Sequence, residues 1–231
     1  MGASVALWHA GPVAITATVV TTWGIMLLLT VAAWAITRRM RVDQPGLLQT
    51  AAEGVVLAIS KAVDEVVPER AATQLLPFVG TLWVFIAVAN LTGVVPGLQS
   101  PTGDLSTTAG LAVIVFLSVH WFGIRTDGLR GYLRHYLSPS PILLPFHLVS
   151  ELTRTVALAM RLFGNIMSLE MAALLVLLVA GFLVPVPLLM LHIVEALVQA
   201  YIFGMLALVY IGGALQVRDP EVVSNKGDVA S

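Results

Sequence analysis

The sequence contains no cysteine and very few charged residues. The absence of cysteine from its 231 residues excludes disulfides, thiolate metal sites and cysteine nucleophiles. Only 11% of the residues are charged, whereas soluble domains carry about 25%. Because 58% of the residues are hydrophobic, the composition predicts a polytopic all-α membrane protein. The net charge of −1 predicts no nucleic-acid partner.

Long apolar segments predict about five membrane helices in a single membrane domain covering residues 1–231. A run of about 20 apolar residues is long enough to cross the hydrocarbon. The expected spans are residues 13–37, 74–95, 107–124, 146–181 and 188–216. The last two form a helical hairpin. Its first helix must tilt strongly or break, because about 35 residues at 1.5 Å each extend beyond about 50 Å.

Residues 46–66 have a different pattern, in which apolar and polar positions alternate at helical spacing. The pattern is typical of an amphipathic helix lying on the membrane interface. A helix that docks against the other spans would show the same pattern, so both interpretations stay open.

Lysine and arginine are absent from the segments expected outside the membrane. The basic clusters are Arg38, Arg39 and Arg41 after the first span, and Arg125, Arg130 and Arg134 after the third. Basic residues concentrate in cytoplasmic loops. The N-terminus is therefore expected outside and the C-terminus in the cytoplasm.

Arg161 lies in an apolar helix with no acidic residue three or four positions away. An arginine at the centre of a membrane helix costs about 2.5–3.5 kcal/mol on insertion scales, and such residues are functional candidates by default. We expect its counter-charge to come from another helix or another protein.

Polar residues fall at matching depths if the two hairpin helices are antiparallel. The level pairs are Arg161 with Gln199, Asn165 with Glu195, and Glu170 with His192. Such alignment predicts a polar seam between the helices. Glu170 and His192 would form a titratable pair able to relay protons.

Several of these polar residues also have structural interpretations. Gln199 and Asn165 could serve as interhelical hydrogen-bonding groups, and Glu195 could pair with Asn165 or Arg154. Asp104 follows turn residues and could cap a helix. Only Arg161 lacks a comparable structural role.

Residues 151–165, ELTRTVALAMRLFGN, resemble the signature of subunit a of F-type ATP synthases. Residues 199–203, QAYIF, are similar to the matching motif of its last helix. Residues 91–97, LTGVVPG, followed by residues 100–108, SPTGDLSTT, resemble its external loop. The resemblance covers roughly residues 74–216, and it departs from the family pattern at Ala157, where many relatives have Ser, and at Thr155, where Pro is common.

The resemblance implies a non-catalytic, ion-translocating stator subunit with two half-channels. Its partners would be a ring of c subunits with a carboxylate opposite Arg161, peripheral-stalk b subunits, the remaining synthase subunits and membrane lipid. It implies a multi-pass protein of a bacterial inner membrane, and no cofactor or metal. A phosphate-binding Gly-x-x-x-x-Gly-Lys-Ser/Thr loop is absent from the sequence, so ATP chemistry would belong to the partner subunits.

The resemblance also assigns roles to individual residues. The ion-translocation set is Arg161, Glu170, His192, Gln199, Asn165 and Glu195. Glu170 and His192 would belong to the outer half-channel, with Asp104 and Asn90 near its mouth. Gln199 would orient Arg161. The candidates on the cytoplasmic side are Glu151 and Arg154.

Three other hypotheses remain at this point. Sodium could replace the proton as the coupling ion. A stand-alone secondary transporter would need its own substrate pocket and often carries inverted repeats, which the sequence lacks. The membrane arm of a redox pump would favour paired histidine ligands, whereas only His192 lies well inside a span near other polar groups.

Overall fold

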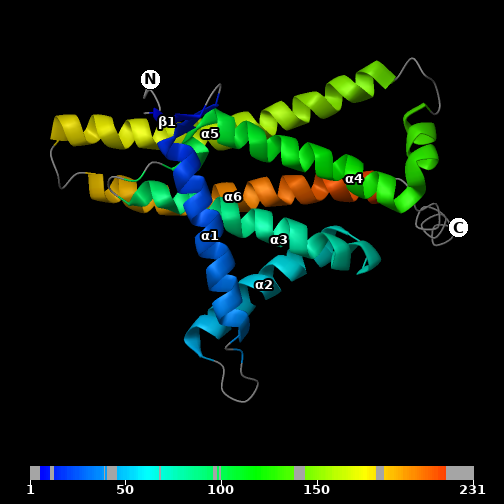
Figure 1. Cartoon of the computed structure of the whole chain (residues 1–231), viewed down its shortest axis with the longest axis horizontal. Coiled ribbons are helices and arrows are strands. Elements are labelled where there is room, and N and C mark those ends of the chain that lie inside the picture. Colours follow the sequence, from blue (N-terminus) through cyan, green and yellow to red (C-terminus); the bar gives the residue numbers. More distant parts are fainter. Residues whose placement is uncertain are drawn as a thin grey trace, which may run out of the picture.

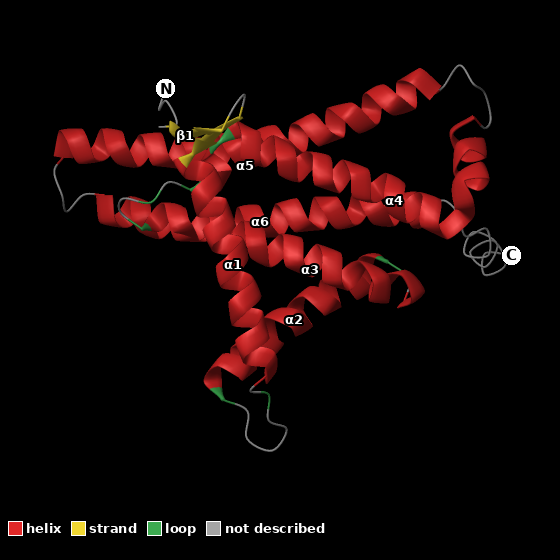
Figure 2. Cartoon of the chain, viewed as in Figure 1, coloured by secondary structure: helices red, strands yellow, loops and turns green. Residues whose placement is uncertain are grey.

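The computed structural model describes residues 6–10, 13–38, 40, 46–67, 69–95, 98, 100–137, 144–180 and 185–216. These residues are almost entirely helical (Figure 2). The helices are α1 (Ala17–Arg38), α2 (Leu47–Val66), α3 (Glu69–Leu91), α4 (Leu105–Leu137), α5 (Leu144–Ala180) and α6 (Pro185–Gln216). Two single-turn helices, η1 (Thr92–Val94) and η2 (Pro101–Gly103), lie between α3 and α4.

Five of the described helices are long and apolar enough to cross a membrane. They are α1, α3, α4, α5 and α6, so the expected all-α polytopic fold is confirmed. Figure 1 shows α3, α4, α5 and α6 running alongside one another while α1 crosses them steeply. If α1 spans the membrane directly, the α5–α6 hairpin is strongly tilted.

A small antiparallel hairpin precedes α1. Strand β1 (Ala6–Ala10) pairs with β2 (Val13–Thr16). The sequence pattern placed the first span from residue 13, but α1 begins at Ala17. Val13, Ile15 and Thr16 are β-branched, and such residues favour extended backbone.

Helix α1 leaves most of its apolar surface uncovered by the rest of the chain. Trp23, Leu27 and Leu28 are all more than half exposed. Its last residue, Arg38, stacks over Trp34 with the guanidinium carbon 4.2 Å from the ring centroid. An apolar helix ending in a cation over an interfacial aromatic is typical of a lipid-facing span.

Helix α2 fits both interpretations of its sequence, a helix on the membrane interface and a helix docked against the other spans. Ile59 and Val63, in its second half, are buried in the core. In its first half Leu47, Leu48 and Val56 are more than half exposed. The helix therefore docks through its second half on α3 and α6, while its first half presents an apolar face that fits a membrane interface.

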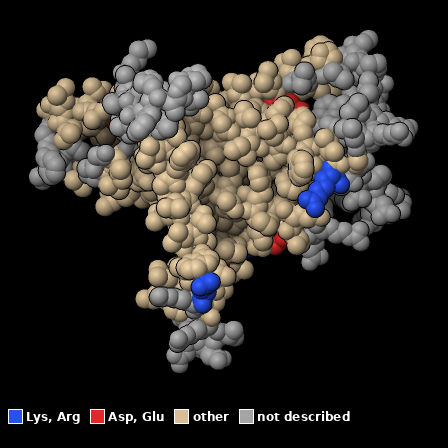
Figure 3. Space-filling view, viewed as in Figure 1, with Lys and Arg blue, Asp and Glu red and all other residues tan. Residues whose placement is uncertain are grey.

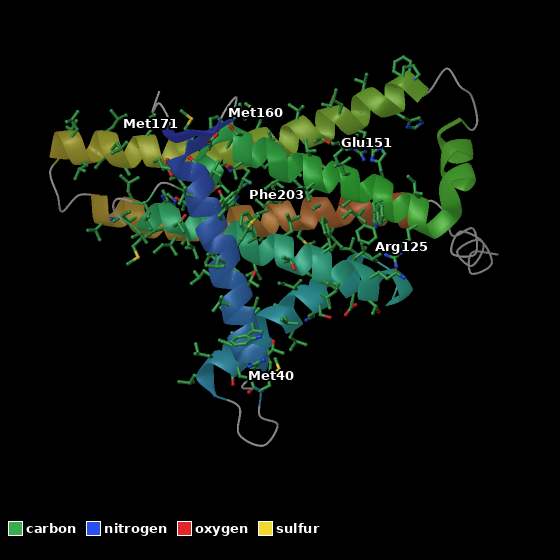
Figure 4. The ribbon with its side chains drawn as sticks, viewed as in Figure 1. Met40, Arg125, Glu151, Met160, Met171 and Phe203 are labelled. Carbon is green, nitrogen blue, oxygen red and sulfur yellow. The ribbon has the colours of Figure 1, made fainter. Side chains whose placement is uncertain are left out.

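Helix α6 lies at the centre of the bundle and packs against α3, α4 and α5. Small buried residues recur along it at Ala196, Ala200, Gly204 and Ala207. Small residues allow membrane helices to approach closely. Phe203, also on α6, is completely buried, and Figure 4 shows it between the helices.

Gly204 makes the closest such approach, and its replacement by alanine is expected to destabilise the protein. A Cβ at Gly204 would lie 2.7 Å from Cδ2 of Trp83, a ring carbon of α3 that has little room to move. Overpacking a core costs about 1–3 kcal/mol. Thermal unfolding in detergent should show the loss for Gly204→Ala. Gly110→Ala is the matched control, because nothing lies within 4 Å of its Cβ position; equal stability of the two variants would contradict this packing.

Helix α4 continues beyond the span expected from the sequence. Hydropathy ended the third span at residue 124, whereas α4 reaches Leu137 across a kink at Gly128, where φ is 72°. Glycine adopts this positive φ without the steric cost of a side chain. The apolar stretch ends at Arg125, and the helical backbone is interrupted at Gly128 before a further helical segment runs to Leu137.

The hairpin helices are close in length to the expected segments. Helix α5 has 37 residues and α6 has 32. Pro185 and Pro187 fall in the first turn of α6, where the backbone N–H groups have no intrahelical partner. The expected turn at residues 181–187 lies largely outside the described residues.

The visible surface of the bundle is almost free of charge. Figure 3 shows uncharged side chains over most of this face, with acidic and basic side chains only toward its right-hand and lower parts. A surface of this kind suits contact with lipid or with other membrane helices.

Candidate functional site: a polar seam in the helical hairpin

The two hairpin helices are joined by a hydrogen bond in the middle of the seam. Nδ2 of Asn165 on α5 donates to Oε1 of Gln199 on α6 over 2.7 Å. Gln199 thus lies opposite Asn165, about one helical turn from the sequence-based alignment with Arg161. The sequence-based alignment assumes that the turn is symmetric and that the two helix axes are parallel. Because α5 and α6 cross at an angle, the residues that face each other are shifted along the helices.

Arg161 points away from the core of the chain. Its side chain is exposed, as is that of the preceding Met160, whereas Leu158 and Leu162 are buried. Within the described ranges no acidic side chain forms an ion pair with Arg161 and no group hydrogen-bonds it. Figure 4 marks this level of α5 at Met160. The guanidinium is therefore presented to whatever covers this face of the hairpin.

Glu170 faces a different surface from Arg161, as their spacing of nine residues predicts. It is half-buried against the loop that contains η2. The main-chain N–H of Ser100 donates to Oε1 of Glu170 over 3.4 Å. A Cβ at Gly103 would come within 3.1 Å of Oε2 of Glu170, so the carboxylate packs directly on this glycine. The loop encloses Glu170 without supplying a cation.

His192 lies in the same region from the α6 side. Its side chain is 3% exposed, and its ring lies within hydrogen-bonding reach of the Asn90 main chain. The ring packs on Gly93, where a Cβ would be 3.1 Å from Nε2 of His192. Glu195, one turn further along α6, is half-buried and interacts electrostatically with His192.

Two buried nitrogens in the seam have no hydrogen-bond partner among the described residues. They are Nε2 of His192 and Nε2 of Gln199, on side chains 3% and 1% exposed. A buried polar atom without a partner costs about 1–3 kcal/mol, and most such atoms in proteins bind ordered water. Both nitrogens lie on one face of α6, which indicates a hydrated line toward the Asn165–Gln199 bond.

The sequence did not reveal the loop residues that connect this region. The Ser100 hydroxyl donates to the carbonyl of Ala89 over 2.9 Å and lies 2.7 Å from the hydroxyl of Thr102. Thr102 donates to Oδ1 of Asn90, and Nδ2 of Asn90 donates to the carbonyl of Ala196. Ser100, Thr102 and Asn90 are all buried, so they tie the loop and α3 to α6. The sequence placed this serine and threonine in a turn-rich segment that resembles the external loop of the family, but it did not indicate these contacts.

Removing the Thr102 hydroxyl should loosen this network. Thr102→Val keeps the side-chain shape but leaves Oδ1 of the buried Asn90 without its donor. An unpaired buried acceptor costs about 1–3 kcal/mol. Hydrogen exchange of residues 89–102 should accelerate in this variant, while Thr30→Val, whose exposed hydroxyl bonds only its own helix, should leave it unchanged. Unchanged exchange in Thr102→Val would contradict the network.

The remaining sequence-based candidates lie at the ends of helices. Oδ1 of Asp104 accepts a hydrogen bond from the N–H of Ser106, so Asp104 caps α4, as its position in a turn suggested. Glu151 and Arg154 lie on the first part of α5, toward the end of the bundle where Figure 4 marks Arg125. The Arg154 guanidinium stacks over Tyr210 of α6 at 5.4 Å from the ring centroid.

These features define a class of protein. The chain is a multi-pass helical membrane protein with a buried polar seam in its last two helices and an arginine presented at the hairpin surface. Among the described residues no three His, Asp or Glu side chains are grouped as metal ligands.

Comparison with known proteins identifies the family. A family model described as "ATP synthase A chain" matches residues 19–212, and the chain belongs to this family. It is 68% identical over 211 residues to ATP synthase subunit a 2 of Pelobacter propionicus, covering 91% of this chain and 92% of that one. It is 65% identical over 216 residues to ATP synthase subunit a 1 of Hahella chejuensis, covering 93% and 91%. Identity to ATP synthase subunit a of Legionella pneumophila is 57% over 209 residues, with 90% of each chain covered.

Proposed function

We propose that this chain is the ion-translocating stator subunit of an F-type ATP synthase and has no catalytic site of its own. Its partners are a rotor ring of c subunits, the b subunits of the peripheral stalk and the remaining subunits of the synthase. It lies in a bacterial inner membrane with its N-terminus outside and its C-terminus in the cytoplasm. Arg38 and Arg125, at the ends of two apolar stretches, support this orientation.

In this mechanism two half-channels reach the level of Arg161 from opposite sides of the membrane. An ion enters from outside, neutralises a rotor carboxylate, travels round with the ring and leaves through the second half-channel. Arg161 attracts each returning carboxylate and helps to release its ion, and its fixed charge blocks direct passage between the half-channels. Each unit charge that crosses contributes about 2.3 kcal/mol per 100 mV.

The observation that carries this proposal is the line of polar side chains that leads toward Arg161. It starts at Glu170, continues at His192, and reaches the Asn165–Gln199 bond one turn from Arg161. Buried unpartnered nitrogens at His192 and Gln199 supply places for water along it. The exposure of Arg161 on the other surface leaves it able to meet a charge carried by a partner.

We further propose that the ion is the proton. Glu170 and His192 exchange protons with water, and His192 is the residue type whose charge changes near neutral pH. Sodium prefers a cage of several oxygen ligands. In the seam, the buried atoms without a partner, at His192 and Gln199, are nitrogens rather than oxygens. Sodium remains the alternative that the experiment below separates.

The test is ion pumping by the complete synthase in sealed vesicles supplied with ATP. Proton uptake and sodium uptake are followed in parallel, with sodium present and absent. Proton uptake that does not need sodium supports the proposal. Sodium uptake that persists when the proton gradient is collapsed would instead make sodium the coupling ion, and the absence of any ATP-driven uptake would contradict the translocating role itself.

A further inference from the structure

Two glycines of the loop between α3 and α4 lie directly against titratable side chains of the seam. A Cβ added at Gly103 would lie 3.1 Å from Oε2 of Glu170 and 3.5 Å from its Cδ. A Cβ added at Gly93 would lie 3.1 Å from both Cε1 and Nε2 of His192. Figure 4 marks this end of α5 at Met171, which follows Glu170 in the chain. Each glycine therefore leaves the space that one of these side chains fills.

The backbone conformation does not require glycine at either position. Glycine is the default residue where φ is positive, because a side chain is strained there. Gly93 in η1 and Gly103 in η2 do not have positive φ. An alanine could keep the same backbone at both positions, so the property that glycine supplies here is room for the neighbouring side chain.

Ser100 connects the two glycine contacts. Its main-chain N–H donates to Oε1 of Glu170 over 3.4 Å, and its Cβ lies 3.2 Å from the position of a Cβ at Gly93. Ser100 is 3% exposed, and its hydroxyl donates to the carbonyl of Ala89 over 2.9 Å, so it has little freedom to move away. A side chain at Gly93 would therefore press both on His192 and on the residue that holds Glu170.

We propose that Gly93 and Gly103 are positioning residues for proton entry. Gly103 sets the place of the Glu170 carboxylate against the loop, and Gly93 sets the place of the His192 imidazole. Proton transfer depends steeply on such placement, since a misplacement of about 1 Å can cost about 10²-fold in rate. This inference rests on the proposed function, because the placement affects conduction only if protons pass Glu170 and His192.

Gly103→Ala tests the placement of Glu170. The new methyl group should shift the carboxylate by a few tenths of an ångström, and the fold should be kept because the displaced group is the end of a flexible side chain. Passive proton conduction of the membrane sector should fall at least about threefold, in proportion to the steep dependence on placement. Gly110→Ala is the matched control, because nothing lies within 4 Å of its Cβ position, and it should conduct like the parent complex.

A double variant separates placement of the carboxylate from general damage to the loop. Glu170→Asp draws the carboxylate back from the loop by one methylene group, which makes room for the methyl group of Gly103→Ala. Substitutions of residues in contact are not additive, whereas those of independent residues are. The loss of conduction in Gly103→Ala/Glu170→Asp should therefore be smaller than the product of the two single losses. In Gly110→Ala/Glu170→Asp it should equal that product.

Gly93→Ala tests the placement of His192 in the same way, and it decides the matter if Gly103→Ala fails to assemble. Conduction should again fall at least about threefold, with normal amounts of the subunit in the complex. Normal conduction in the glycine variants that assemble would overturn the inference, as would losses that simply multiply in Gly103→Ala/Glu170→Asp. The proposed function would still stand in that case if Glu170→Gln lost conduction in the same preparation.

Discussion

Replacing Arg161 with alanine is expected to abolish ATP-driven ion pumping by the assembled synthase. The side chain is exposed on α5 and has no ion-pair partner among the described residues, so its charge is available to a rotor carboxylate. Removing one member of a buried ion pair costs about 3–5 kcal/mol, and each 1.4 kcal/mol is about a factor of ten. We therefore expect a loss of more than roughly 100-fold, together with increased passive leak through the membrane sector.

Two further variants control this experiment. Arg38→Ala removes an exposed arginine at the end of α1, which stacks on Trp34, and should leave pumping close to wild type. Arg161→Lys retains the charge without the planar donor geometry and should keep the barrier to leak better than alanine does. Near-normal pumping by Arg161→Ala in a fully assembled complex would remove the role proposed for this residue.

Replacing Glu170 with glutamine should slow proton entry from the outside at least about tenfold, because proton transfer by a positioned carboxylate contributes roughly 10²–10⁴-fold. The amide keeps the size of the side chain, so its packing on Gly103 and Ser100 is preserved while its ability to exchange a proton is lost. The measurement is passive proton conduction of the membrane sector after removal of the catalytic head. Glu53→Gln on α2 is the control.

Measuring conduction and assembly separately distinguishes a loss of proton transfer from structural damage. Glu170→Gln should retain normal amounts of the subunit in the purified complex. If conduction were unchanged at normal assembly, Glu170 would have only a packing role, and the outer route would have to avoid the η2 loop.

The membrane helices could be predicted from the sequence because lipid restricts which residues a spanning helix can contain. A spanning helix needs about 20 apolar residues, and charge is excluded from its interior. For the same reason Arg161 was identifiable, since a mid-helix arginine without a local partner violates that requirement. The sequence could not define the first residue of α1. Val13 and Thr16 are uncharged, like the residues of a membrane helix, but their β-branched side chains favour a strand.

The contacts within the site depend on tertiary geometry that one sequence does not encode locally. The position of Gln199 opposite Asn165 follows from how α5 and α6 cross, which a count of residues from the turn cannot give. The hydrogen bonds of Ser100 and Thr102 form only when the loop folds onto α3 and α6, so the sequence alone does not indicate them. His120 of α4 and Glu151 of α5 are distant in the sequence, and only the packing of α4 on α5 brings Nε2 of His120 to 3.7 Å from Oε2 of Glu151.

The central claim is that ions cross only when the rotor turns past Arg161, and a reversible lock tests it most directly. Met160→Cys, next to Arg161 and 51% exposed, would be cross-linked to a single cysteine introduced in a rotor subunit. Passive proton flux through the membrane sector is measured with the disulfide formed and after reduction. We predict that flux stops while the rotor is locked and returns on reduction. Undiminished flux through the locked complex would instead show a continuous channel within this chain and would contradict the account.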